Sequence, residues 1–159
     1  MHPVADAVLG GWVVSTITNF AHGLPLQFTA PNANGTYGFG TQRPNIANLK
    51  DAQLAAPIPD RWFNTAAFTA PAVYTVGSAP RWVPNIRYGA TRHSDIAVMK
   101  RFRIGERIRS QFRAEFFNAF NRPQFGRADT SLASGSFGRV GGTTNVGPRN
   151  IQLGLKIDF

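Results

Sequence analysis

The chain contains no cysteine, few acidic residues and no long hydrophobic run. The absence of cysteine excludes disulfide bonds and thiolate chemistry. The longest uncharged apolar run near the N-terminus, residues 7–14, is far shorter than the roughly 18 residues that a membrane-spanning helix requires. The first residues also lack the basic and hydrophobic regions of a secretory signal. The sequence therefore predicts no transmembrane helix, and export would require a segment that precedes residue 1.

Charged residues make up only 16% of the chain, against roughly 25% in an average soluble domain. They are strongly unbalanced, because 14 arginines and 3 lysines face 8 acidic residues and give a formal net charge of +9. Such an excess of positive charge favours binding to nucleic acid, anionic lipid or an acidic ligand, and charge alone does not distinguish among these partners. The abundance of Gly and Phe, with 16 and 13 residues, favours β structure with long loops.

The last eleven residues alternate strictly between apolar and polar or small side chains. Because successive side chains on a strand point to opposite faces, residues 149–159 are predicted to form a strand with one apolar face. Eleven residues at about 3.3 Å each, tilted by about 45°, span about 25 Å along the membrane normal. That span matches the apolar band of an outer-membrane barrel, although a half-buried strand of a soluble sheet would show the same alternation.

Two further strands are predicted at roughly 94–104 and 108–120 and read as a hairpin. Their apolar residues fall on one face only if Ile104 lies opposite Ile108, which implies a three-residue turn that contains Gly105. Lys100 interrupts the apolar set. With the last strand, the apolar face is expected to contact lipid in a membrane barrel and comprises Ile96, Val98, Phe102, Ile104, Ile108, Phe112, Phe116, Ile151 and Leu153.

The first predicted strand covers roughly residues 11–29 and is kinked near Gly23 and Pro25. Residues 1–10 are expected to form a turn that leads into it. Residues 31–92 are rich in proline and residues 121–148 in glycine, and neither segment keeps a period of 2 or 3.6. Loops of this length are unusual in a compact soluble fold but are common on the extracellular side of a membrane barrel. The expected fold is therefore all-β and antiparallel, with about four strands and two long loops.

Several segments, in the same order along the chain, resemble the last part of TonB-dependent receptors of the Oar-like group, which carry a carboxypeptidase-regulatory-like domain at their N-terminus. The most extensive is Phe-Arg-Ala-Glu-Phe-Phe-Asn-Ala-Phe-Asn-Arg-Pro-Gln-Phe-Gly at residues 112–126, similar to the penultimate strand and its loop. The others are residues 10–15 with 23–25, 43–45, 62–68 and the terminal aromatic strand. Together they cover nearly the whole chain.

The resemblance implies that residues 1–159 are a single C-terminal segment of a transmembrane β-barrel of about 22 strands in the outer membrane of a Gram-negative bacterium. In this family a plug fills the barrel, and an energised TonB complex pulls a motif near the N-terminus to release the cargo. Plug and motif are both absent here, so ligand uptake is expected only within the full-length protein. The long loops would be extracellular. An isolated four-stranded piece is expected to aggregate or be degraded.

The resemblance also assigns residues and partners. Leu155, Ile157 and Phe159 resemble the signal read by the barrel-assembly machinery, or else serve only in packing against lipid or core. The basic cluster of Arg101, Arg103, Arg109 and Arg113, in which Arg103 is predicted to lie opposite Arg109, would face the lumen. There it would meet acidic residues of the plug or form a solvated wall, and Glu115 could pair with Arg113. Expected partners are outer-membrane lipid, the assembly machinery, the plug and the remaining strands of the parent receptor. The TonB complex would act only through the absent N-terminal part.

A soluble basic β-domain that binds nucleic acid or another polyanion is the alternative hypothesis, with bases stacked on Trp62, Phe63, Trp82 and Tyr88. This hypothesis is disfavoured because the phenylalanines of the strands lie on one face of the sheet and the arginines on the other, whereas base stacking requires both on the same face. No catalytic pattern is present, and no cofactor is expected. The three histidines, His2, His22 and His93, lack metal-ligand spacing, and the glycine-rich segment 135–142 is not a phosphate-binding motif.

Overall fold

The computed structural model describes residues 8–32, 35, 40–105, 107–143 and 147–159. The chain divides into two compact units. One comprises Met1–Phe20, Arg92–Pro123 and Val146–Phe159, and contains the long strands. The other comprises Ala21–Thr91 and Gln124–Asn145, and is called the loop module below. No helix in the described part of the chain is long and apolar enough to cross a membrane.

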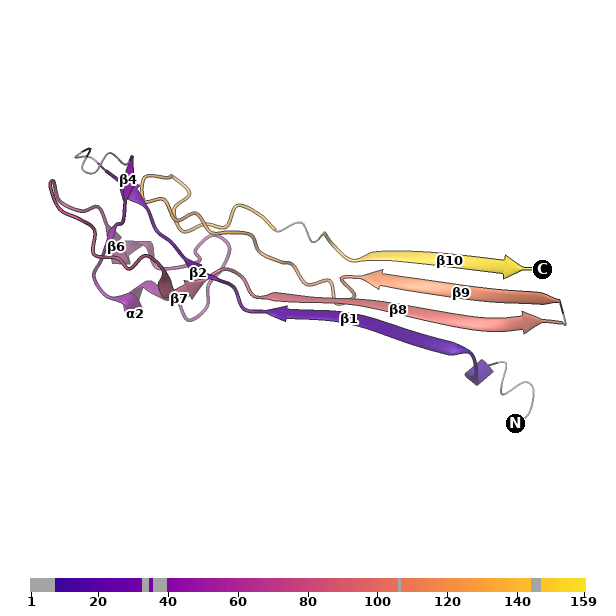
Figure 1. Cartoon of the computed structure of the whole chain (residues 1–159). Helices are drawn as coiled ribbons and strands as arrows, with labels where there is room; N and C mark the ends of the chain where they lie inside the picture. The colour runs from indigo at the N-terminus through magenta and orange to yellow at the C-terminus, as the bar shows by residue number, and fades with distance from the viewer. Residues whose placement is uncertain (1–7, 33–34, 36–39, 106, 144–146) are drawn as a thin grey trace. The chain divides into compact units, whose positions relative to one another are not determined.

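The long strands form one four-stranded antiparallel sheet in the order β1-β8-β9-β10 (Figure 1). Their bounds are β1 at Trp12–Ala21, β8 at Thr91–Ile104, β9 at Ile108–Phe117 and β10 at Asn150–Asp158. The end of β10 and the turn between β8 and β9 lie at the same end of this sheet (Figure 1). The predicted all-β class, with four antiparallel strands, is therefore confirmed.

The register between β8 and β9 agrees with the one predicted from the apolar pattern. Ile104 pairs with Ile108, and Arg103 lies directly opposite Arg109. Gly105, the first residue of the turn, has a φ of 68°, a left-handed conformation that glycine adopts without steric cost. A shift of one residue would have moved every apolar side chain of β9 to the opposite face, so the pattern and the turn reinforce one register.

Three predicted strands are shorter in the structure than the sequence suggested, and the last of them, expected over 149–159, loses one residue at each end. The strand expected over 11–29 ends at Ala21, and the chain continues into the separate strand β2, Pro25–Leu26. The break lies at Gly23, where a Cβ atom would come within 2.0 Å of the carbonyl oxygen of Tyr88. The strand expected over 108–120 ends at Phe117, because Asn118 has a φ of 50° and leaves the extended conformation. Strand β8 begins three residues before the expected 94.

The segments expected to be long, aperiodic loops contain short paired strands. In the loop module β2 pairs with β7 (Val83–Arg87), β3 (Ala30–Pro31) with β4 (Thr41–Gln42), and β5 (Asn45–Ile46) with β6 (Phe68–Thr69). A helical turn α2 at Leu49–Ala52 and a 3₁₀ turn at Thr65–Ala67 lie between them. Both turns begin with an asparagine whose side chain accepts a backbone N–H of the first turn. Local capping thus stabilises elements that are too short for a periodic signal.

The loop module has a hydrophobic core of its own. Three aromatic rings pack against Phe137 of the second loop, residues 121–148. They belong to Phe28, which precedes the first loop, and to Phe63 and Phe68 within that loop, residues 31–92, with ring centroids 6.3, 5.2 and 5.9 Å from that of Phe137. Backbone hydrogen bonds also join the two loops, among them Trp62 N–H to Gly138 O at 2.8 Å. The two loops therefore fold as one unit. Its buried core consists of Leu26, Phe28, Ala52, Phe63, Ala67, Phe68, Val83, Ile86 and Ala128.

Candidate functional site: the two faces of the sheet

One face of the sheet carries the apolar side chains of three adjacent strands. In β10 these side chains are largely exposed, with Leu153 at 69% and Leu155 at 63%. Soluble monomers seldom expose a continuous apolar surface of this kind. The register aligns three strands in rows, which are Ile96, Phe116 and Ile151; Val98, Ala114 and Leu153; Lys100, Phe112 and Leu155; and Phe102, Ser110 and Ile157.

The predicted lipid-facing residues in these rows therefore share one face of the backbone ladder, and the backbone of Ile104 pairs with that of Ile108 at the turn. Two residues of the predicted assembly signal, Leu155 and Ile157, lie in the same rows. Phe159 follows the end of β10, has the same parity, and is fully exposed. The structure thus brings these residues together on one side of the sheet.

The sheet ends on both sides in exposed strands. Every residue of β1 and of β10 is exposed, and within the described ranges no strand pairs with their outer edges. An exposed edge offers a row of unpaired N–H and C=O groups to another strand. Four strands also fall short of the roughly eight that close the smallest barrels. The sheet is therefore open and able to accept a further strand on either side.

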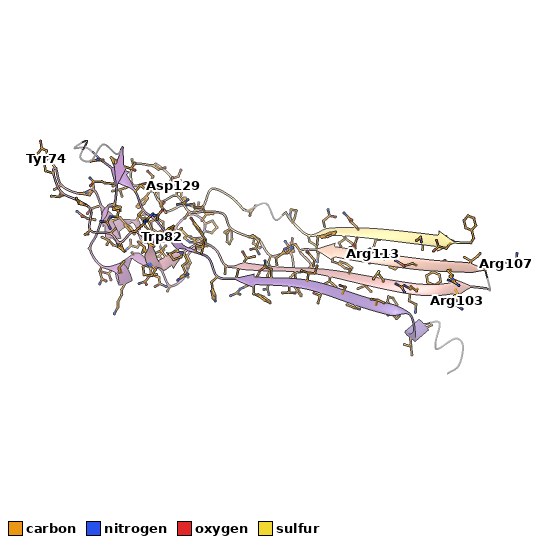
Figure 2. The ribbon with its side chains drawn as sticks, in the orientation of Figure 1. Tyr74, Trp82, Arg103, Arg107, Arg113 and Asp129 are labelled. Atoms are coloured by element: carbon orange, nitrogen blue, oxygen red, sulfur yellow. The ribbon has the colours of Figure 1, made fainter. Side chains whose placement is uncertain are left out.

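The opposite face of the sheet carries the predicted basic cluster. Arg103 faces Arg109 directly, and the side chains of all four arginines of the cluster are exposed. Figure 2 places Arg103 and Arg107 near the β8–β9 turn and Arg113 farther from it. Arg113 pairs with Glu115, as expected, and Lys156 pairs with Asp158 at 3.0 Å. Among the described residues, Arg101, Arg103 and Arg109 have no ion-pair partner, so positive charge accumulates beside the turn.

Lys100 occupies a position on the apolar face and is 9% exposed. Its ammonium group donates hydrogen bonds to the carbonyl oxygens of Val8 and Gly10, and lies 4.8 Å from the ring centroid of Trp12. These contacts offset the cost of a cation on an apolar surface by satisfying its donors and adding a cation–π interaction. The interruption of the apolar pattern was visible in the sequence, but its partners, about 90 residues away, were not.

A buried asparagine holds the end of the sheet opposite the β8–β9 turn. Asn118 is 3% exposed, and its side chain hydrogen-bonds both backbone groups of Arg122 and the carbonyl oxygen of Gly147. Its backbone N–H donates to Asp95 Oδ1 at 2.9 Å, and the same oxygen lies 2.9 Å from His93 Nε2. This cluster, which sequence reasoning missed, fixes where β9 ends and where the segment that leads into β10 returns.

Replacing Asn118 with alanine is expected to lower the free energy of unfolding by about 2–4 kcal/mol. The variant loses three side-chain hydrogen bonds worth roughly 1 kcal/mol each and retains an unfavourable left-handed φ. Asn118→Gly, which loses the same bonds but tolerates that φ, is expected to be less destabilised. Urea unfolding of both variants in lipid vesicles measures the difference, and equal stability of Asn118→Ala and the unmodified protein would contradict the assigned role.

The aromatic residues considered for base stacking are mostly used in packing. Phe63 is fully buried, and Trp62 and Tyr88 pack against the core of the loop module. The indole N–H of Trp62 donates to the carbonyl oxygen of Arg87 at 2.7 Å. Only Trp82 of this set is substantially exposed, at 49%. Among the described residues, the structure therefore presents no row of exposed aromatic side chains that alternates with the arginines of the basic cluster. His22 is exposed, and His2 lies outside the described residues.

An open antiparallel sheet with an exposed apolar face, an opposite basic face and long connections at one end has the geometry of barrel strands. The family described as outer membrane beta barrel domain matches residues 1–152. The chain belongs to this family. The barrel family is one of the outer membrane of Gram-negative bacteria, in agreement with the location expected from the sequence. Comparison of this barrel domain with curated proteins and with solved structures gave no match.

Proposed function

We propose that this barrel domain provides the closing strands of a TonB-dependent outer-membrane receptor of the Oar-like type, and that it takes part in ligand uptake within the full-length protein. The observation that carries the proposal is the segregation of apolar and basic side chains across β8, β9 and β10. A membrane barrel needs an apolar outer face against lipid and a polar inner face. In a soluble sheet, an apolar row as exposed as that of β10 would face water, which is unfavourable and rare.

In this proposal the apolar rows contact lipid, and Arg101, Arg103, Arg109 and Arg113 line the lumen. The free edges of β1 and β10 pair with the other strands of the barrel, which removes the unpaired backbone groups that lipid cannot solvate. Leu155, Ile157 and Phe159 form the signal for the barrel-assembly machinery, which takes up the strand by edge pairing. The arginines without ion-pair partners in the described structure are balanced by acidic residues of a plug.

The test requires the native protein. An antibody against this segment is expected to detect, in the outer-membrane fraction, a polypeptide much larger than the 17.3 kDa of this chain. That protein should be retained by the immobilised periplasmic domain of TonB, and a variant without its N-terminal plug region should not be. Recovery in the cytoplasmic fraction, or equal retention of both proteins, would contradict the proposal.

A further inference from the structure

The loop module contains a small polar surface built from three extended segments. Residues 127–129 run antiparallel to 139–141, with Ala128 bridged to Val140, and Thr29 forms a parallel bridge with Ser131. Hydrogen bonds from Thr29 N–H to Thr130 O at 3.1 Å and from Leu132 N–H to Thr29 O at 2.8 Å fix the parallel pair. The segments around residues 29, 129 and 139 are therefore neighbours, although the first lies far from the other two in the sequence.

Alternation on these segments separates core from surface. Leu26, Phe28 and Ala30 are at most 3% exposed, as is Ala128, and Val140 packs against the same core. The residues between them have the opposite parity and point away from the core. They are Gln27, Thr29, Arg127, Asp129, Ser131 and Arg139. With Asp60 and Ser136 they line a pocket of about 660 Å³, a volume within the usual range for small-molecule sites.

The charges of this pocket are incompletely paired. Asp129 is used by its own turn, since its Oδ1 accepts the N–H of Ser131 and its Oδ2 accepts the hydroxyl of Ser134. Arg127 lies 5.6 Å from the ring centroid of Tyr88, which orients the guanidinium without neutralising it. Among the described residues, Arg127, Arg139 and Asp60 have no ion-pair partner. The pocket therefore offers the guanidinium groups of Arg127 and Arg139, the unpaired carboxylate of Asp60 and several hydroxyl groups.

We propose that this pocket binds an acidic saccharide, a ligand that carries carboxylates and hydroxyl groups together. Arg127 and Arg139 would bind carboxylates, for which a guanidinium provides two parallel donors. Asp60 and Gln27 would accept hydrogen bonds from sugar hydroxyls, and Thr29, Ser131 and Ser136 would add hydroxyl donors and acceptors. A peptide fits less well, because the lining has no apolar residue beyond Ala128 and Val140 to hold a side chain.

The inference rests on the proposed receptor function, because it names the class of ligand that such a receptor would take up. It predicts that carboxylate and hydroxyl groups must both be present for tight binding. Trigalacturonic acid has both, maltotriose has only hydroxyls, and tri-aspartate has carboxylates without sugar hydroxyls. Titration calorimetry of the full-length protein, purified from outer membranes in detergent, compares the three probes. Trigalacturonic acid is expected to bind at least about 10-fold more tightly than either of the others.

Substitutions in the pocket assign the binding to these residues. Arg127→Gln and Arg139→Gln are each expected to weaken binding of trigalacturonic acid roughly 10- to 100-fold, as the loss of a charged hydrogen bond predicts. Arg81→Gln is the matched control, because Arg81 is an exposed arginine of the same module that does not line the pocket. It is expected to bind within about twofold of the unmodified protein.

The outcomes separate this inference from the receptor proposal. Equal binding of tri-aspartate and trigalacturonic acid, equal affinity of Arg139→Gln and Arg81→Gln, or no binding at millimolar concentrations would each overturn the pocket assignment. If the protein in these experiments still migrates as an intact, heat-modifiable barrel and still binds TonB, the receptor function stands. If no intact outer-membrane barrel is recovered, both proposals fail.

Discussion

Replacing Leu153 with arginine in the full-length protein is expected to prevent most of it from inserting into the outer membrane. Leu153 lies near the middle of β10, is 69% exposed, and pairs with Ala114 of β9 on the apolar face. If this face contacts lipid, arginine here must leave water near the centre of the bilayer, at a cost of about 2–4 kcal/mol. Urea titration of the protein folded into vesicles measures this cost, and the yield in outer membranes reports insertion.

The control for this variant is Gln152→Arg, on the same strand and on the opposite face. Gln152 pairs with Glu115, which lies on the basic face of the sheet. An added arginine at this position remains hydrated and has a carboxylate across the strand, so insertion is expected to be nearly unchanged. If Gln152→Arg reduced insertion as strongly as Leu153→Arg, the assignment of lipid to the apolar face would be wrong.

Replacing Phe63 with alanine is expected to unfold the loop module or to weaken it by about 3–5 kcal/mol. Phe63 is fully buried and lies at the centre of the aromatic cluster, with its ring centroid 4.9 Å from that of Phe28 and 5.6 Å from that of Phe68. Removal of the ring leaves a cavity and breaks three edge-to-face contacts, including the one with Phe137. Limited proteolysis of the membrane-inserted protein should show faster cleavage within both loops.

Cleavage in both loops is the specific expectation, because the core joins residues of the first loop to Phe137 of the second. Tyr74→Ala removes an aromatic side chain of the same module that is 86% exposed and lies at the tip of its loop (Figure 2). That control should change stability by no more than about 0.5 kcal/mol. Faster cleavage confined to the first loop of Phe63→Ala would contradict a shared core.

The strands and their register could be predicted from the sequence because they depend on local rules. A period of two assigns each side chain to a face, and a three-residue turn containing glycine leaves one alignment that keeps Ile104 beside Ile108. The same two rules are enough to place Arg103 opposite Arg109. The strand ends were less predictable, because contacts outside the strands determine them. Strand β1 ends at Ala21, shortly before Gly23 packs against the backbone of Tyr88, and β9 ends at Phe117, next to the buried Asn118.

The alternation of apolar and polar residues was thus sufficient for the strands, their two faces and the hairpin turn, because each of these depends on residues close in sequence. The pairing of β1 with β8 and of β9 with β10 joins segments far apart in sequence and required the folded chain. The loop module, the environment of Lys100 and the polar pocket required the folded chain. Phe28 meets Phe137, and Thr29 meets Ser131, only after loops far apart in sequence have closed on one another. Such contacts are selected by complementary packing and by the pairing of buried backbone groups, which have no period along the chain.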